Sequence, residues 1–184
     1  MMGTSLYGII PIGKRIKIVE VFGYSTKGIP GLEIIGLKNL SRTMKEKFVF
    51  IGKTKNISIP LKRYVLCVEN GLDAEKMSEE ELRNLELPLL LLYWTLAGVI
   101  QIGNLSDCYA SGRVDPNGKV DCYTYSPEVL EWLASKGERS PLRLLLTKSI
   151  SALKHRYALP IEEVMEPLYR LDGQSSGELE MTWS

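Results

Sequence analysis

Apolar and polar positions alternate along most of the chain in a pattern typical of an α/β (α+β) domain. β-branched and aromatic residues at every second position predict strands, whereas apolar residues three or four positions apart predict helices. This pattern predicts strands over residues 5–12, 16–24, 32–37, 57–68 and 142–147, and a hairpin of 107–114 with 119–125. It predicts helices over residues 38–49, 87–101, 126–136, 148–156 and 161–171, and a short helix within the surface segment 70–86. We therefore expect a mixed, partly antiparallel sheet backed by helices.

The longest apolar stretch runs from Leu87 to Ile102. It is shorter than the roughly 20 apolar residues that a membrane-spanning helix needs, and it contains Gly98, so we expect no membrane span. Apolar residues on all of its faces instead predict a helix buried in the middle of the fold. Pro88 suits the first turn of that helix, because its missing N–H has no intrahelical partner there.

A length of 184 residues predicts one domain, over residues 1–171, followed by a linker-like tail, 172–184. The 23 basic and 22 acidic side chains leave a net charge of +1, which excludes a polybasic arm or an acidic tail as the main feature. Cysteines occur only at Cys67, Cys108 and Cys122, with no CxxC spacing. This odd number excludes a disulfide framework, and we expect free thiols and a cytoplasmic location.

Charge is segregated along the sequence although the total is nearly neutral. The acidic segment Glu69–Glu86 has seven acidic and two basic residues. The segment before it has a single acid, Glu46, and eight basic residues, namely Lys38, Arg42, Lys45, Lys47, Lys53, Lys55, Lys62 and Arg63. Such a basic region can contact the phosphate backbone of a nucleic acid without reading its sequence, and a solvated surface is the alternative interpretation.

Four segments stand in one order over roughly residues 5–125: Gly28–Leu37 (GIPGLEIIGL), a basic helix, Ile59–Leu66 (IPLKRYVL) and Leu87–Gly98 (LPLLLLYWTLAG). This order resembles the N-terminal, ChlI-type domain of the magnesium-chelatase-like (YifB/ComM-type) competence proteins. In that family a GLPGF-x-[IV]-VGL strand, a helix, an FP-x-KR-[IV] strand and a DLP-[IL]-A-[LI]-G helix follow one another, and a G-E-L-x-L-D-G-R segment stands where the hairpin is predicted here. The resemblance implies a fold like the Lon-protease catalytic domain. Whole members of the family continue into an AAA+ ATPase, and the best-known members process branched DNA during transformation.

The sequence departs from this family pattern at three places that matter for chemistry. The PADL-x-KEG loop of the family is replaced by Glu69–Lys76, which lacks that pattern. The Lon fold carries its nucleophilic serine just after the proline of the central helix, where this chain has Leu89 and Leu90. The nearest candidate for the lysine of the Lon enzymes, Lys119, is about two positions off. We therefore expect no Ser-Lys dyad at the expected positions.

Two other apparent motifs are also rejected. Gly52-Lys53-Thr54 resembles the end of a Walker A motif, but Lys47 stands where the first glycine is required, and a predicted strand follows instead of a helix. The single histidine, His155, has no metal-ligating residues at suitable spacing. The sequence therefore predicts no catalytic, cofactor-binding or metal-ligating residues and no cofactor.

The favoured functional hypothesis is a non-catalytic accessory or assembly domain that resembles the N-terminal part of a magnesium-chelatase-like AAA+ protein, with no enzymatic activity of its own. Its expected partner is an AAA+ ATPase module or another protein subunit, and it can belong to an oligomer. One alternative is a weak, sequence-independent nucleic-acid-binding module that contacts the DNA backbone through the basic region. The other is a Lon-like serine peptidase with a relocated nucleophile.

Overall fold

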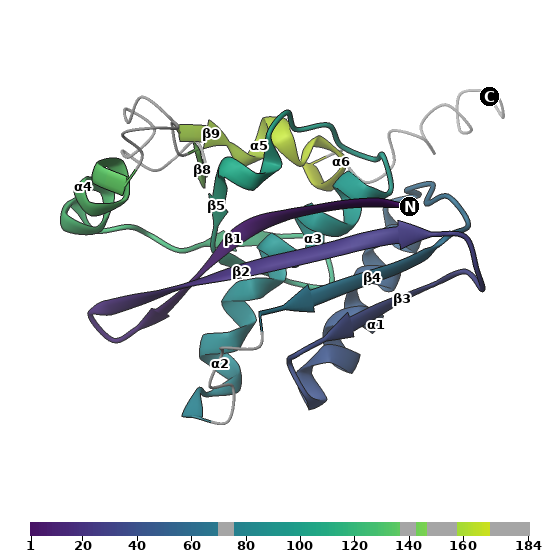
Figure 1. Ribbon diagram of the computed structural model, residues 1–184, viewed down its shortest axis with the longest axis horizontal. Helices are drawn as coiled ribbons and strands as arrows, with labels where there is room; N and C mark the ends of the chain where they lie inside the picture. Colours follow the sequence, from purple (N-terminus) through teal and green to yellow (C-terminus); the bar gives the residue numbers. More distant parts are fainter. Residues whose placement is uncertain (70–75, 137–142, 147–157, 170–184) are drawn as a thin grey trace, which may run out of the picture.

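A seven-stranded mixed sheet is the framework of the computed structural model, which describes residues 1–69, 76–136, 143–146 and 158–169 (Figure 1). Its strand order is β3-β4-β2-β1-β5-β8-β9. The strands are β1 (Met2–Ile12), β2 (Arg15–Thr26), β3 (Gly31–Ile35), β4 (Arg63–Val68), β5 (Cys108–Ala110), β8 (Arg143–Leu146) and β9 (Ala158–Pro160). Strand β2 is antiparallel to β1 and β4, whereas β3 is parallel to β4 and β5 is parallel to β1 and β8. The predicted mixed, partly antiparallel sheet is confirmed.

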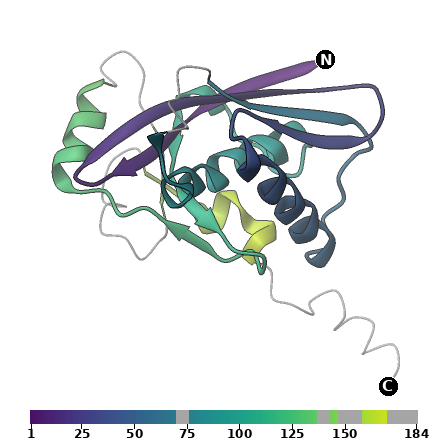
Figure 2. The ribbon, with the colours of Figure 1, turned by 90° about the horizontal axis from the view of Figure 1, so that it is seen from below.

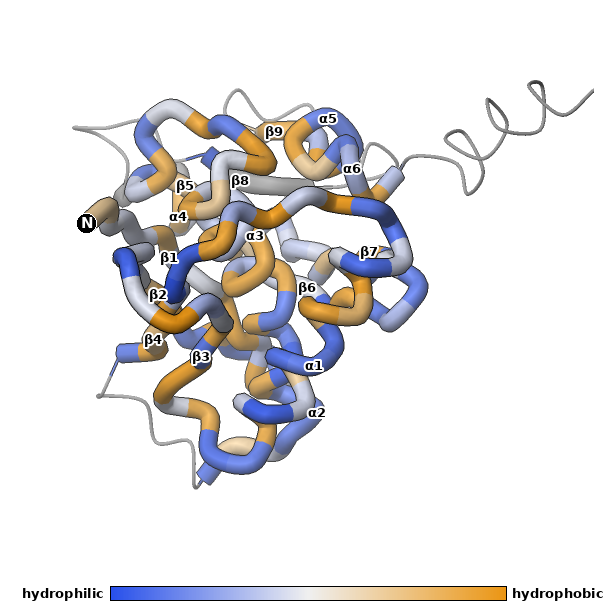
Figure 3. Tube along the Cα trace, turned by 90° about the vertical axis from the view of Figure 1, so that its right-hand side faces the viewer, coloured by the Kyte–Doolittle hydropathy of each residue, from blue (hydrophilic) through white to orange (hydrophobic). Residues whose placement is uncertain are grey.

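Two helices cover one face of this sheet: α1 (Asn39–Thr54) and α3 (Glu86–Leu96) (Figure 2). Helix α1 buries its apolar stripe, Leu40, Met44, Phe48 and Ile51, as its period predicts. Helix α3 is buried around nearly its whole circumference and is largely orange in Figure 3, the colour of hydrophobic residues. The prediction of a central buried helix is confirmed.

Helix α3 ends at Leu96, five residues before the predicted end at residue 101. The cause is Gly98, which has a φ of 73° and donates its N–H to the Thr95 carbonyl at 3.1 Å. A glycine in this left-handed conformation just after the last turn is a common way for a helix to end. The apolar residues that follow, among them Ile100, are still buried but lie outside the helix.

The opposite face of the sheet is covered at one end by α4 (Pro127–Lys136). A second apolar cluster, of Ile9, Tyr109, Tyr125 and Leu133, forms there. Smaller elements complete the described structure: α2 (Glu79–Leu82), the 3₁₀ turns η2 (Arg83–Leu85) and η3 (Leu105–Asp107), the hairpin of β6 (Gly112–Val114) with β7 (Val120–Cys122), α5 (Ile161–Val164) and α6 (Glu166–Tyr169).

Other predicted elements also differ from the structure in their bounds or continuity. The predicted strand 57–68 begins only at Arg63, because residues 57–62 include Pro60, which has no N–H to donate to a sheet ladder. The first arm of the predicted hairpin, 107–114, is split, because Cys108–Ala110 joins the main sheet instead. The helix predicted over 161–171 is interrupted at Met165, where φ is −100° and ψ is 37°.

The predicted helix 148–156, His155 and the predicted tail 172–184 lie outside the described residues. Across the part of the chain that the structure describes, no helix combines the length and apolar character needed to span a membrane.

Candidate functional site

The start of α3 is the position where the resemblance to the Lon fold places a nucleophile. Pro88 is the third residue of this helix, and the residue after it, Leu89, is completely buried. A leucine side chain has no group that can attack a carbonyl, and burial closes this position to a substrate. The helix start is therefore part of the core.

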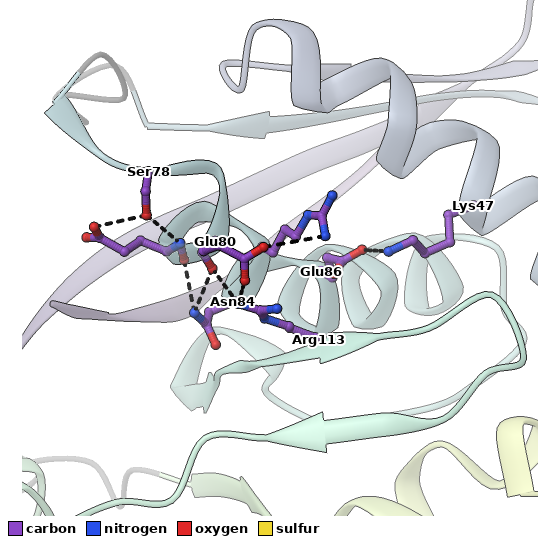
Figure 4. A network of polar contacts seen from close by, with 8 residues as sticks. Lys47, Ser78, Glu80, Asn84, Glu86 and Arg113 are labelled. Carbon is purple, nitrogen blue, oxygen red and sulfur yellow. Dashed lines mark hydrogen bonds and ion pairs between the residues drawn. The ribbon is translucent and has the colours of Figure 1, made fainter. Parts of the chain in front are cut away.

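An ion pair occupies the first turn of α3 instead. The Lys47 ammonium, from α1, donates a hydrogen bond to the carboxylate of Glu86 (Figure 4). The Glu86 side chain is only 2% exposed and that of Lys47 is 16% exposed. Burial raises the pKa of Glu86, while the hydrogen bond and charge of Lys47 and the charges of Arg83 and Arg113 act to lower it. The pair links α1 to α3 beneath the sheet, and we therefore assign it a structural role.

A second group of charges surrounds α2 next to this pair. Glu80 accepts a hydrogen bond from Arg113 of β6 and lies 3.8 Å from the guanidinium of Arg83. Ser78 caps α2 by accepting the N–H of Glu81 at 3.1 Å. Figure 4 shows these side chains between α2 and the β6–β7 hairpin. Glu80 and Glu86, two residues of the acidic segment, therefore form ion pairs with other elements of the fold.

A groove of about 1010 Å³ lies between β3 and the adjacent flank of α1. Leu32, Glu33 and Ile34 form the strand side of the groove, and Ser41 and Glu46 contribute to the helix side. Five basic residues line it, namely Lys27, Lys38, Arg42, Lys45 and Arg63. Only two acids, Glu33 and Glu46, are among its lining residues, and we call this hollow the basic groove.

The cations of the basic groove differ in their pairing. Arg63 donates to the Glu33 carboxylate at 2.9 Å, and both side chains are about half exposed. Within the described residues, Lys27, Arg42 and Lys45 form no ion pair. These three cations are therefore available to a negatively charged ligand, and the exposed pair of Arg63 with Glu33 is weak enough to rearrange.

Only half of the predicted basic region belongs to this groove. Lys38, Arg42, Lys45 and Arg63 line it, whereas Lys47 is used in the buried pair with Glu86. Lys53 lines a smaller hollow of about 510 Å³ on another flank of α1, and Lys55 has its Cε 3.2 Å from the position that a Cβ at Gly118 would occupy. Lys62 is exposed in the loop before β4.

Sequence reasoning missed two residues that matter here. Lys27 lies eleven positions before Lys38 and enters the groove only because the chain turns at 27–30 into β3. In the sequence, Glu86 is the last residue of the polar segment 70–86. An acidic residue directly before a fully apolar helix is itself a signal, because a buried carboxylate needs a charged or hydrogen-bonding partner.

Gly52-Lys53-Thr54 lies at the C-terminal end of a helix and not at a helix start. It forms the last turn of α1, where carbonyl groups rather than N–H groups are left unpaired, so it cannot cradle a phosphate. None of the three cysteines is joined in a disulfide. Among the described residues, no three His, Cys, Asp or Glu side chains gather closely enough to hold a metal ion.

Comparison with models of known protein families finds none that matches this chain, and comparison with curated proteins finds no match either.

Proposed function

We propose that this chain is a non-catalytic accessory domain of the magnesium-chelatase-like type, which acts by binding a protein partner. The partner is an AAA+ ATPase module or another subunit of the same assembly. The observation that carries this proposal is the closed start of α3, where Leu89 and Leu90 are fully buried and Glu86 is neutralised by Lys47. The described start of α3 therefore offers no nucleophile at the position that the resemblance implies, which supports a binding role over a catalytic one.

The order of the elements supports the same proposal. Strand β3 follows a glycine- and proline-containing turn, α1 comes next, and β4 starts at the arginine of the Lys62-Arg63 pair. The proline-containing helix α3 and the β6–β7 hairpin follow in the order that the resemblance implies.

Nucleic-acid binding is the second candidate, and the basic groove favours it. Four of the eight predicted basic residues face one hollow, together with Lys27. Contacts from these side chains to phosphates would give weak affinity that is independent of sequence and falls steeply with salt. Of the other four, Lys47 is held in the buried pair with Glu86 and Lys53 lines a different hollow, so these two add no cation to the groove.

The proposed function is tested with an AAA+ module of a magnesium-chelatase-like protein from which its own N-terminal domain has been removed. We expect the full chain, added in trans, to co-sediment with this motor in sedimentation velocity experiments. We also expect the chain alone to hydrolyse neither ATP nor casein and to resist labelling by a fluorophosphonate probe for reactive serines. Independent sedimentation of the two proteins at about 50 μM, where weak complexes still form, would contradict the proposal, and so would turnover by the chain.

The nucleic-acid candidate is tested by fluorescence anisotropy with single-stranded, duplex and branched DNA at low and physiological salt. Binding that disappears in the Arg42→Glu, Lys45→Glu double variant would support it. No binding at low salt would leave protein partners alone.

A further inference from the structure

Strand β3 is the outermost strand of the sheet, and within the described residues it pairs only with β4. Its Gly31 N–H donates to the Lys62 carbonyl at 3.1 Å, so Gly31 faces β4. Successive residues of a strand point their backbone groups to opposite sides. The N–H and C=O groups of Leu32 and Ile34 therefore point away from β4, along the free edge.

This free edge is short and carries one charged residue, Glu33, but several other devices that usually prevent strand pairing are missing from it. Its residues, GLEII, contain no proline and no lysine, and the register with β4 is regular along all five positions. Edge strands in natural proteins are normally protected by prolines, bulges, inward-pointing charges or a covering element. An edge left open beside a groove is the arrangement by which many domains accept an extended peptide as an added strand.

The basic groove runs along the same edge. Leu32 and Ile34, whose backbone groups are unpaired on this side, both line it, and α1 forms its other wall. A strand added next to β3 would lie about 4.8 Å from it, at the border of this hollow, and five residues would span about 17 Å. The side chains of Arg42 and Lys45 line the helix side of the same hollow, so they are placed to meet the side chains of an added strand.

We propose that the basic groove binds an extended acidic segment of a partner protein, which adds to the sheet as a strand beside β3. Its backbone pairs with the N–H and C=O groups of Leu32 and Ile34, and its carboxylates meet Lys27, Arg42 and Lys45. This inference rests on the proposed function and deepens it, because it names the surface and the chemistry of the partner. A polypeptide suits the site better than DNA, since a phosphate backbone offers acceptors only and cannot satisfy the carbonyls of β3.

The probe is a fluorescent ten-residue peptide of alternating glutamate and valine, titrated against the full chain. We expect saturable binding that weakens at least about tenfold when every peptide nitrogen is methylated, because charge is kept and the donors are lost. Amide hydrogen exchange at Leu32 and Ile34 should slow in the complex. Exchange at Glu33 and Ile35, which face β4, should not change. Equal binding of the two peptides, or unchanged exchange at Leu32 and Ile34, would overturn the inference.

Two variants with equal changes of net charge separate the groove from general electrostatics. The Arg42→Glu, Lys45→Glu variant should bind the peptide at least about tenfold more weakly. The Lys14→Glu, Lys53→Glu variant changes exposed lysines outside the groove and should bind within about twofold of the parent. Thermal unfolding of both variants controls for folding, and equal weakening in both would contradict a specific groove.

The outcomes also distinguish this inference from the proposed function. If the motor associates with the chain and charge reversal at Arg42 and Lys45 leaves that association intact, the inference is wrong and the proposed function stands. If the acidic peptide binds and protects Leu32 and Ile34 but the motor does not associate, the proposed partner is wrong and strand addition stands. Tighter binding of single-stranded DNA than of the peptide, with no change in exchange at Leu32 and Ile34, would make the groove a phosphate site instead.

Discussion

The Lys47–Glu86 pair gives the sharpest test of how the core is built. Lys47→Met keeps the length and apolar stem of the side chain but leaves the Glu86 carboxylate buried without its partner. Removal of one member of a buried pair typically costs about 3–5 kcal/mol. Because Lys47 is 16% exposed and Arg83 and Arg113 still act on Glu86, we expect the lower end, about 3 kcal/mol at pH 7. With a usual urea dependence for a chain of this size, this shifts the midpoint by roughly 1–2 M.

The cost should depend on pH in a defined direction. Loss of Lys47 removes the hydrogen bond and charge that lower the pKa of Glu86, so the pKa rises further above that of the unfolded chain. A carboxyl with a raised pKa in the folded state binds more protons when folded. Its contribution to stability is complete below the unfolded pKa of about 4.3 and is lost as pH rises through the folded pKa. The difference between Lys47→Met and the parent should therefore be small at pH 4 and large at pH 7.

A double variant tests whether the buried charge causes this loss of stability. Replacing both partners, as Lys47→Met with Glu86→Leu, removes the buried charge altogether, and we expect stability within about 1 kcal/mol of the parent. Urea unfolding followed by circular dichroism at pH 4 and pH 7 measures all three proteins. Three results would contradict a stabilising Lys47–Glu86 pair. They are an unchanged urea midpoint for Lys47→Met at pH 7, an equal loss of stability at both pH values, and a double variant as unstable as the single one.

Three further predictions concern single side chains. Leu91→Ala, in the fully buried part of α3, should cost about 2–5 kcal/mol by leaving a cavity, and an unchanged urea midpoint would contradict its burial. The hydroxyl of Tyr125 is buried without a hydrogen-bond partner among the described residues, so Tyr125→Phe should be neutral or stabilise by up to about 1 kcal/mol. A clear loss of stability would show an unrecognised bond. Burial raises the pKa of Cys108 to about 11, so a thiol reagent should label Cys67 and Cys122 well before Cys108 in the native chain, as measured by peptide mass spectrometry. Equal labelling rates would be evidence against this packing.

The elements that could be predicted from the sequence are those with strong local patterns. Residues 5–12 and 16–24 are rich in β-branched and aromatic residues in near alternation, and they form β1 and β2. The apolar run from Leu87 forms most of α3. The residues of β5 lie within a predicted strand, but their pairing could not be predicted, because they join the sheet beside Tyr7 and Gly8, about 100 positions earlier. A local pattern carries no information about such a distant partner.

Only four of the eight predicted basic residues line the basic groove, and the reason is again geometric. A count of charges ignores direction, and residues two positions apart on a helix point roughly 200° apart. Lys45 therefore faces the groove while Lys47 faces α3, although both belong to one basic segment. The free edge of β3 could not be predicted at all, since which strand lies outermost depends on the order of the whole sheet.

We propose that this chain binds a partner along β3 and carries out no chemistry at α3. Amide hydrogen exchange of the full chain, alone and saturated with the magnesium-chelatase-like motor, tests it most directly. We expect slower exchange at Leu32 and Ile34 in the complex, with little change across α3, whose residues are already buried. A complex that leaves Leu32 and Ile34 exchanging as fast as in the free chain would contradict it.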